Sequence, residues 1–360
     1  MDILKPQLSS IELRAVVLEL QHLVGGKIDQ IYEQNDEFTI RIHSRGKEML
    51  CFMPGKYIYI KKEKPAMEQP GGFCMQLRKN LTQSRIASIS QLGAQRIVAF
   101  DIEANESTYR LIIELFAKGN VLLCEHNVIK GVLHQLRTSS RELFVGKEYK
   151  EPPLEHNVFE MDEDAFIALL HTSTRDSIVT ALAMDVGVGG MFAEEICARA
   201  HLDKKESPKK AHRVVYTTLH TLLNEIPRGY IYDTGICAPV KLSAVLVEEF
   251  DTFNQALEKT LSQSADMRVR AAQTSQYNQK LERLNTILYQ QEQKLHEIDA
   301  GADEFTKKGD MIYEKYTDVK VLLDTVEALR KEKGWDGVKT FLAAKELEAD
   351  LKEKKVKVEL

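Results

Sequence analysis

Residues 178–200 read IVTALAMDVGVGGMFAEEICARA. Apolar residues recur at helical spacing on both sides of Gly187-Val188-Gly189, which predicts two short helices, over Ile178–Val186 and Ala193–Ala200, joined by a glycine turn. A helix N-terminus after such a turn presents unpaired backbone N–H groups and the positive end of the helix dipole, which suits a phosphate. We interpret the stretch as a helix-hairpin-helix, with these candidate phosphate-binding residues: Gly187, Val188, Gly189 and Gly190.

This hairpin predicts a nucleic-acid ligand without deciding which one. Contacts to sugar and phosphate position a nucleic acid but do not read its bases, so the partner is either DNA or RNA. A glycine-linked helix pair that serves packing alone is the alternative.

Bulk composition predicts two or three modules. The chain has 360 residues, of which 43% are hydrophobic and 29% charged, enough to bury at least one sizeable core. Its net charge of −5 is not that of a polycation that coats nucleic acid indiscriminately. Any basic surface is therefore expected to be local.

Cysteine usage and the N-terminus predict a cytoplasmic protein. The five cysteines never form a C-x-x-C pair, and their odd number suits reduced thiols. Met1–Pro6 lacks the pattern of a secretory signal, and no apolar run is long enough to span a bilayer, so we expect no membrane partner. Neither a structural zinc site nor any other cofactor is expected.

The first part of the chain has a mixed pattern. A buried helix is expected from Ser9-Ser10 to Gly25-Gly26, and another over Phe73–Leu81 with a basic edge of Arg78, Lys79 and the later Arg85. Strands are expected over Lys27–Tyr32, Phe38–His43, Met49–Met53, Tyr57–Lys61, Ile97–Ala104, Tyr109–Phe116 and Asn120–Glu125.

The later part becomes helical. A helix over Asp162–Leu170 precedes the hairpin, and Tyr230–Tyr232 is expected to be a strand that returns to the first module. From about Ala265, apolar residues follow a three-four spacing that predicts two long antiparallel helices with a turn at Ala300-Gly301. The positions of this seam are Tyr277, Leu281, Leu284, Leu288, Leu295, Ile298, Ile312, Tyr316, Val319, Leu323 and Val326.

Several separate motifs, taken together and in order, resemble the NFACT family, which includes RqcH, NEMF and proteins long labelled fibronectin-binding A. The resemblance covers nearly all 360 residues. The motifs are Ser9-Ser10-Ile11-Glu12-Leu13, Gly25-Gly26-Lys27-Ile28, Phe73-Cys74-Met75-Gln76-Leu77-Arg78-Lys79, Gln91-Leu92-Gly93-Ala94-Gln95-Arg96-Ile97, Glu114-Leu115-Phe116-Ala117-Lys118-Gly119-Asn120 and Gly190-Met191-Phe192-Ala193-Glu194-Glu195.

This resemblance implies an α+β protein in three parts. An NFACT-N domain over 1–172, similar to the lobes of formamidopyrimidine-type DNA glycosylases, is followed by a helix-hairpin-helix module with a returning segment over 173–264 and an antiparallel coiled-coil arm over 265–360. In the family the arm continues into an RNA-binding NFACT-R domain, so we expect this chain to be a fragment, with a truncated arm.

Family members recognise large ribosomal subunits with stalled peptidyl-tRNA, and they hold tRNA so that the nascent chain is extended without a message. The resemblance therefore implies these partners: the large ribosomal subunit, tRNA and peptidyl-tRNA. It also implies no catalytic side chain, because the ribosome supplies the peptidyl transferase centre. In agreement, the sequence has no Walker loop, H-E-x-x-H or G-x-S-x-G, nor the N-terminal proline of the glycosylases.

Binding to RNA is expected to depend on basic side chains that neutralise phosphates. The candidates are Arg78, Lys79, Arg85, Arg96, Lys118, Arg137 and Arg141. Glu12 and Gln95 complete the set, because they match two positions where many members have aspartates associated with tRNA handling. A neutral Gln95 cannot orient Arg96 as a carboxylate would, which makes tail synthesis less secure than tRNA binding. An Arg96 that pairs with Glu12 to pin the first helix to the sheet is an equal alternative.

Three further interpretations stay open. The old family label suggests a surface adhesin that binds fibronectin, against which the missing secretion signal weighs. Plain DNA binding through the hairpin is the second. Self-association through the coiled coil is the third.

Overall fold

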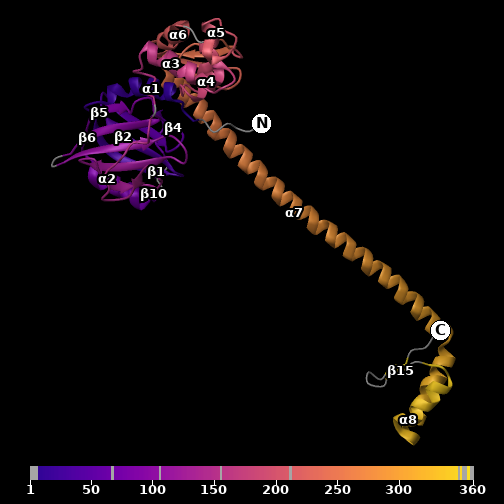
Figure 1. Cartoon of the computed structure of the whole chain (residues 1–360). Helices are drawn as coiled ribbons and strands as arrows, with labels where there is room; N and C mark the ends of the chain where they lie inside the picture. Colours follow the sequence, from indigo (N-terminus) through magenta and orange to yellow (C-terminus); the bar gives the residue numbers. More distant parts are fainter. Residues whose placement is uncertain are drawn as a thin grey trace. The chain divides into compact units, whose positions relative to one another are not determined.

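The computed structural model describes residues 7–65, 69–104, 107–154, 156–210, 213–347, 349–350 and 355–356. Side chains at 265–276, 349–350 and 355–356 are outside that description. Outside it too lie Met1–Pro6, on which the prediction of no secretory signal depends, and most of the charged end at 352–360. The chain divides into two compact units, 1–268 and 269–360 (Figure 1).

A nine-stranded antiparallel sheet forms the frame of the first unit. Its order, β4-β3-β2-β1-β5-β6-β7-β8-β9, consists of two meanders that meet where Lys27 pairs with Arg85. The strands are β1 (Lys27–Gln34), β2 (Glu37–His43), β3 (Lys47–Met53), β4 (Tyr57–Lys61), β5 (Arg85–Gln91), β6 (Ile97–Glu103), β7 (Thr108–Glu114), β8 (Asn120–Glu125) and β9 (Val128–Val132), and a two-stranded sheet of β10 (Leu136–Arg137) and β11 (Glu142–Leu143) follows. The expected strands are all present, whereas β5 and β9 were not expected.

Tight turns with left-handed backbone join neighbouring strands. Asn35 and Asp36 both have positive φ, 49° and 66°, which is the backbone of the two-residue hairpin between β1 and β2. His126 and Asn127 repeat it between β8 and β9, with φ of 48° and 66°. Asparagine and aspartate tolerate this conformation better than other residues with side chains.

Two helices accompany the sheet. Helix α1 (Ser10–Leu20) begins as expected after Ser9, whose side chain accepts a hydrogen bond from the Glu12 N–H while the Glu12 carboxylate accepts one from the Ser9 N–H. A 3-10 turn, η1 (Gln21–Leu23), extends it, and helix α2 (Gly72–Leu81) contacts β1 and β9. Arg85 was predicted to extend the basic edge of this helix, and that prediction is wrong. The helix ends at Leu81, and Arg85 is the first residue of β5.

The helical module has its own core. It consists of α3 (Glu163–Thr172), α4 (Ile178–Met184), α5 (Gly190–Arg199), η2 (Pro208–Lys210) and α6 (Arg213–Leu223). The helix-hairpin-helix is confirmed as α4 and α5, whereas α6 was not expected. Ile11 of α1 is buried in this core, while Leu13 and Val16 of the same helix are buried in the core of the sheet. Helix α1 therefore joins the two cores.

A three-stranded sheet leads back to the first module. It has the order β13-β12-β14, from β12 (Gly229–Tyr232), β13 (Cys237–Ala238) and β14 (Leu246–Phe250). The expected strand at Tyr230–Tyr232 is present as β12, and its Ile231 packs in the core of the nine-stranded sheet. Phe253 and Leu257, in the first turns of helix α7 (Phe253–Glu314), are buried in the same core.

The start of α7 covers the outer edge of the sheet. Asn254 Oδ1 accepts a hydrogen bond from the Ile60 N–H at 2.6 Å, and its Nδ2 donates to the Ile60 carbonyl oxygen at 2.9 Å. The side-chain amide thus pairs with the main chain of edge strand β4 as a neighbouring strand would. Glu19 of α1 accepts hydrogen bonds from the N–H groups of Phe253 and Asn254, at 2.6 and 2.8 Å. This carboxylate caps the helix N-terminus.

The arm contains long helices, as expected, but the turn is elsewhere. Helix α7 continues through Gly301 to Glu314, and the break before α8 (Tyr316–Ala344) falls at Lys315. A single glycine costs a helix only about 1 kcal/mol, which a helix of 62 residues tolerates. Gly334, with φ of 64°, interrupts α8. The short strand β15 (Ala349–Asp350) pairs with β16 (Lys355–Val356).

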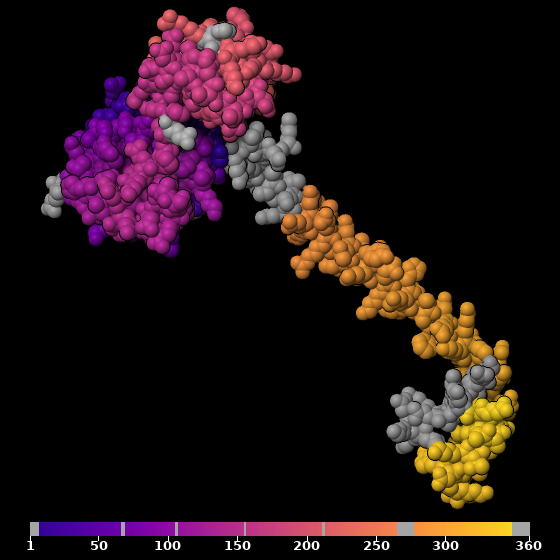
Figure 2. Space-filling model, in the orientation of Figure 1, coloured from indigo at the N-terminus to yellow at the C-terminus, as the bar shows by residue number. Residues whose placement is uncertain are grey.

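Apolar seam residues of α7 are exposed. Figure 2 draws the part of the chain that carries them in orange. Leu281, Leu284, Leu288 and Leu295 are 44–60% exposed, so the packed antiparallel seam predicted from the spacing is not formed among the described residues. No helix within the described ranges combines the length and apolarity needed to cross a membrane. The α+β class, the mixed N-terminal domain and the long C-terminal helices are confirmed.

Candidate nucleic-acid interface

The glycine turn between α4 and α5 has the backbone that its sequence predicted. Gly187 and Gly189 have φ of 81° and 83°, a region that side chains rarely adopt. Val188 between them is buried in the helical core, and its N–H donates to the Leu182 carbonyl oxygen at 3.2 Å. No side chain in the described part of the chain caps α5, and the first turn of this helix carries no acidic residue. Its first N–H groups are therefore suited to an anion.

We expect Gly189→Ala to lower the free energy of unfolding by about 1–3 kcal/mol, because φ of 83° with ψ of 159° is nearly restricted to glycine. Gly190→Ala is the matched control, since Gly190 is the first residue of α5 and a Cβ there meets nothing within 4 Å. It should be neutral or stabilising by a few tenths of a kcal/mol. Urea denaturation measures both, and equal effects would contradict the assigned backbone.

A cavity of about 520 Å³ lies against this turn. Gly187 and Gly189 line one side, the N-terminus of α1 lines another, and Arg96 and Gln95 come from the segment before β6. We call it the Arg96 cavity, because Arg96 alone carries a charge among the described residues that line it. The structure thus brings together the hairpin and the Gln95-Arg96 pair, which the sequence predicted separately.

Arg96 is held at the wall of this cavity. Its guanidinium donates to the Leu8 carbonyl oxygen at 3.5 Å. Burial lowers the pKa of Arg96, and the nearby Glu12 carboxylate opposes this shift. The ion pairs found in the described ranges do not include Arg96 with Glu12, so Glu12 acts on Arg96 through its field rather than through a direct contact.

Glu12 is buried and serves α1. Its Oε2 accepts the Ser9 N–H at 2.6 Å, within the capping box. Burial raises its pKa, while the Ser9 hydrogen bonds and the charge of Arg96 lower it. Such a carboxylate caps α1 and is not a surface contact.

Gln95 ties two segments of the wall together. Its Nε2 donates to the Pro152 carbonyl oxygen at 2.9 Å, and its buried Oε1 has no hydrogen-bond partner among the described residues. Gln91 Nε2 donates to the Gln95 carbonyl oxygen at 2.8 Å and to the Ser10 carbonyl oxygen at 3.1 Å. The uncharged amides of Gln91 and Gln95 therefore form hydrogen bonds at the position where the resemblance implies an aspartate.

Arg141 is not available to a ligand, contrary to the expectation. Its side chain is 5% exposed, and it forms a two-point ion pair with Glu114 on β7, with distances of 2.5 and 3.1 Å. The Tyr149 hydroxyl also donates to Glu114, at 3.2 Å. Arg141 stabilises the fold by neutralising a buried carboxylate.

The other predicted basic residues do not line the Arg96 cavity. Arg78 donates to the Ile31 carbonyl oxygen at 2.7 Å and Arg85 to that of Gly25 at 3.1 Å. Lys79 and Lys118 are exposed, and Arg137 pairs with Glu142 at 2.9 Å. The sequence named these basic residues as candidates one by one and did not indicate whether they lie together in the fold.

Sequence reasoning missed part of the wall. Pro152 and Pro153 line the cavity, although no pattern in the sequence pointed to either residue. No local pattern links them to the hairpin, because the contacts depend on the fold. Within the described ranges, no three His, Cys, Asp or Glu side chains gather as a metal site would require.

Comparisons with known proteins agree with the resemblance in the motifs. The archaeal Rqc2 homolog aRqcH of Methanocaldococcus jannaschii is 28% identical over 372 residues, which cover 94% of this chain and 54% of that protein. The Rqc2 homolog RqcH of Bacillus subtilis is 28% identical over 210 residues, which cover 53% of this chain and 37% of that protein. The chain thus spans about half or less of the length of these relatives.

A solved structure shares the fold. The N-terminal part of the fibronectin/fibrinogen-binding protein from Streptococcus suis aligns with a TM-score of 0.61 at 20% identity, covering 71% of this chain and all of that one. A family model described as the NFACT N-terminal and middle domains matches residues 9–356. With nearly the whole chain matched, the protein belongs to the NFACT family.

Proposed function

We propose that this chain is a non-catalytic, RNA-binding factor of ribosome quality control. In this proposal it binds the large ribosomal subunit with stalled peptidyl-tRNA and holds tRNA by its backbone. The observation that carries the proposal is the Arg96 cavity, which is lined by the Arg96 guanidinium and by Gly189, the residue immediately before α5. A guanidinium and a helix N-terminus both stabilise a phosphate. The names of the relatives, RqcH and Rqc2 homologs, support the ribosomal setting.

Support for template-free tailing of the nascent chain is the finer part of this proposal. It depends on Gln95, whose amide holds Pro152 and does not form an ion pair with Arg96. Arg96 would therefore hold a phosphate without the orienting carboxylate of other members. We place tRNA holding first and tailing second for this reason.

Replacing Arg96 by alanine is expected to weaken tRNA binding and to reduce the slope of log affinity against log salt concentration by about one unit, because one phosphate contact is lost. Arg213→Ala is the matched control, since Arg213 is exposed on α6, pairs with Glu163 and does not line the cavity. An unchanged slope in Arg96→Ala would remove Arg96 from the interface. Wild-type protein that fails to bind tRNA in dilute buffer would refute the proposed function.

The adhesin alternative has support in the name of the Streptococcus suis protein, but a likeness at 20% identity extends to the fold alone. Cell fractionation separates the two functions. Co-sedimentation with large ribosomal subunits favours the ribosomal role, and sensitivity to protease at the cell surface favours the adhesin. Duplex DNA that displaces tRNA from the protein would favour the DNA-binding alternative. Self-association through the exposed seam of α7 stays a prediction.

A further inference from the structure

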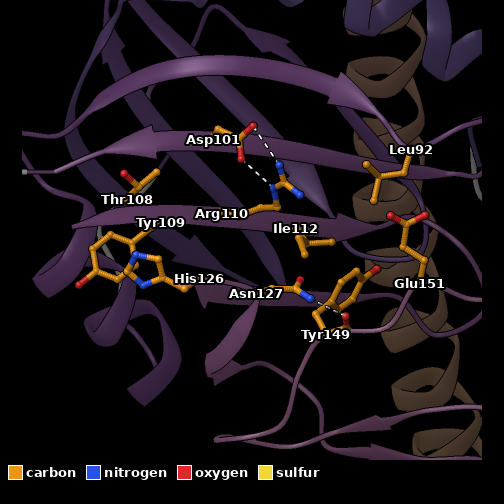
Figure 3. Close-up of a pocket in the computed structure, with 10 residues that line it drawn as sticks. All are labelled: Leu92, Asp101, Thr108, Tyr109, Arg110, Ile112, His126, Asn127, Tyr149 and Glu151. Carbon is orange, nitrogen blue, oxygen red and sulfur yellow. Dashed lines mark hydrogen bonds and ion pairs between the residues drawn. The ribbon is translucent and has the colours of Figure 1, made fainter.

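A second cavity, of about 570 Å³, adjoins the Arg96 cavity over strands β6 and β7 (Figure 3). The two share a wall, because Leu92 and Glu151 line the second cavity while Gln95 and Pro152 line the first. The hydrogen bond from Gln95 Nε2 to the Pro152 carbonyl oxygen, 2.9 Å long, holds this wall together. A ligand chain that crosses the wall therefore meets both cavities.

The two cavities have opposite charge. In the second, the Asp101 carboxylate accepts hydrogen bonds from Arg110 at 2.7 and 3.2 Å, so these two charges cancel. Glu151 is exposed and makes no hydrogen bond or ion pair within the described ranges. One negative charge remains there, against one positive charge in the Arg96 cavity. A phosphate is therefore favoured beside Arg96 and disfavoured in the second cavity.

The interior of the second cavity suits a flat, uncharged group. Leu92, Ile112 and the ring of Tyr149 form apolar walls, and the Tyr149 hydroxyl is turned to Glu114, which fixes the ring. In Figure 3 the Tyr149 ring lies with Asn127 on one side and Glu151 on the other. These walls match the face of an aromatic base.

Two of the polar side chains that line this cavity, Asn127 and Glu151, offer hydrogen-bond acceptors. Asn127 Nδ2 donates to Glu148 Oε1 at 2.9 Å and to the Tyr149 carbonyl oxygen at 3.3 Å, while Asn127 Oδ1 has no partner in the part of the chain that the structure describes. This oxygen and the Glu151 carboxylate are both acceptors. The complementary ligand therefore carries N–H groups.

We propose that the second cavity binds an unpaired RNA base with an exocyclic amino group, cytosine or adenine rather than uracil, while its neighbouring phosphate lies in the Arg96 cavity. The inference rests on the proposed function and adds base preference to it. Carboxylates accept a hydrogen bond from the amino group of cytosine, whereas uracil presents a carbonyl oxygen at the same position. Unpaired bases that are splayed from a strand are the usual targets of sequence preference in RNA.

The test compares the binding of a short oligocytidylate and an oligouridylate of equal length. We expect wild-type protein to bind the cytidylate about tenfold more tightly. Glu151→Gln should lower this ratio, because an amide oxygen accepts a hydrogen bond more weakly than a carboxylate, and Glu151→Lys should reverse it. Glu160→Gln is the control, because Glu160 is exposed and lines neither cavity. Glu151→Gln should leave the salt slope unchanged, since no phosphate contact is removed.

Three results would overturn the inference and leave the proposed function standing. The first is equal, salt-dependent binding of both oligonucleotides by the wild type. The second is a preference that both Glu151→Gln and Glu151→Lys leave unchanged. The third is a cavity that binds a lysine-rich peptide through Glu151 without any preference among bases. If the wild type binds neither oligonucleotide nor tRNA, the proposed function fails first.

Discussion

Replacing Arg141 by methionine is expected to lower the free energy of unfolding by about 3–5 kcal/mol, the usual cost of removing one partner from a buried ion pair. The Glu114 side chain is 3% exposed. Among the described residues, its carboxylate would be left in the interior with the Tyr149 hydroxyl as its one side-chain partner. Methionine keeps most of the volume of the arginine side chain, which confines the effect to charge. Urea denaturation followed by circular dichroism measures it.

Arg137→Met is the matched control for this prediction. Arg137 lies four residues away on β10, with its side chain 71% exposed, and its ion pair with Glu142 is a surface pair of small value. A change of no more than about 0.5 kcal/mol is expected for it. The double variant Glu114→Gln with Arg141→Met should recover part of the loss, because no charge is then left buried. Equal losses at Arg137 and Arg141 would contradict the buried pair.

Gly119→Ala is expected to cost about 3–5 kcal/mol, or to prevent folding. A Cβ on Gly119 would lie 2.0 Å from the Gly55 nitrogen and 2.1 Å from the Pro54 carbonyl carbon, which are main-chain atoms that cannot turn away. The φ of 75° adds strain of about 1–3 kcal/mol. Thermal and urea unfolding measure the loss of stability, and the yield of soluble protein reports a failure to fold.

Gly146→Ala separates strain from contact. Gly146 has a similar φ of 86°, but a Cβ there meets nothing within 4 Å. It should therefore lose only the strain contribution, about 1–3 kcal/mol. If Gly119→Ala is no worse than Gly146→Ala, the close approach of the two turns is wrong.

This contact also illustrates the limit of sequence-based prediction here. The turns at Asn35-Asp36 and Pro54-Gly55 can be predicted from their own residues, because a turn depends on the φ preferences of the residues within it. The backbone contact of Gly119 with Gly55 joins two different hairpins, and nothing in either segment indicates it. Local chemistry predicted the elements, whereas their mutual approach required the fold.

For the candidate site, too, the sequence predicted the individual parts and not their arrangement. The hairpin and Arg96 could be found from a local pattern and a family motif, but their meeting on one cavity could not. Arg141 was predicted to bind RNA because it is basic. In the structure it is buried and forms an ion pair with Glu114, and nothing in the sequence indicated that burial. The exposed seam of α7 was predicted as packed because its spacing is that of a coiled coil, and spacing does not show whether a partner helix is present.

The pairing of Asn254 with Ile60 has a consequence for solubility. An open edge of a large antiparallel sheet can add a strand from another molecule, which is a route to aggregation. Here one amide side chain occupies both main-chain hydrogen-bonding groups of Ile60 on β4. A protein shortened to end before Phe253 would lose this cover together with the apolar side chains beside it. Its nine strands would then present an edge at which copies of the protein could join one another into insoluble aggregates.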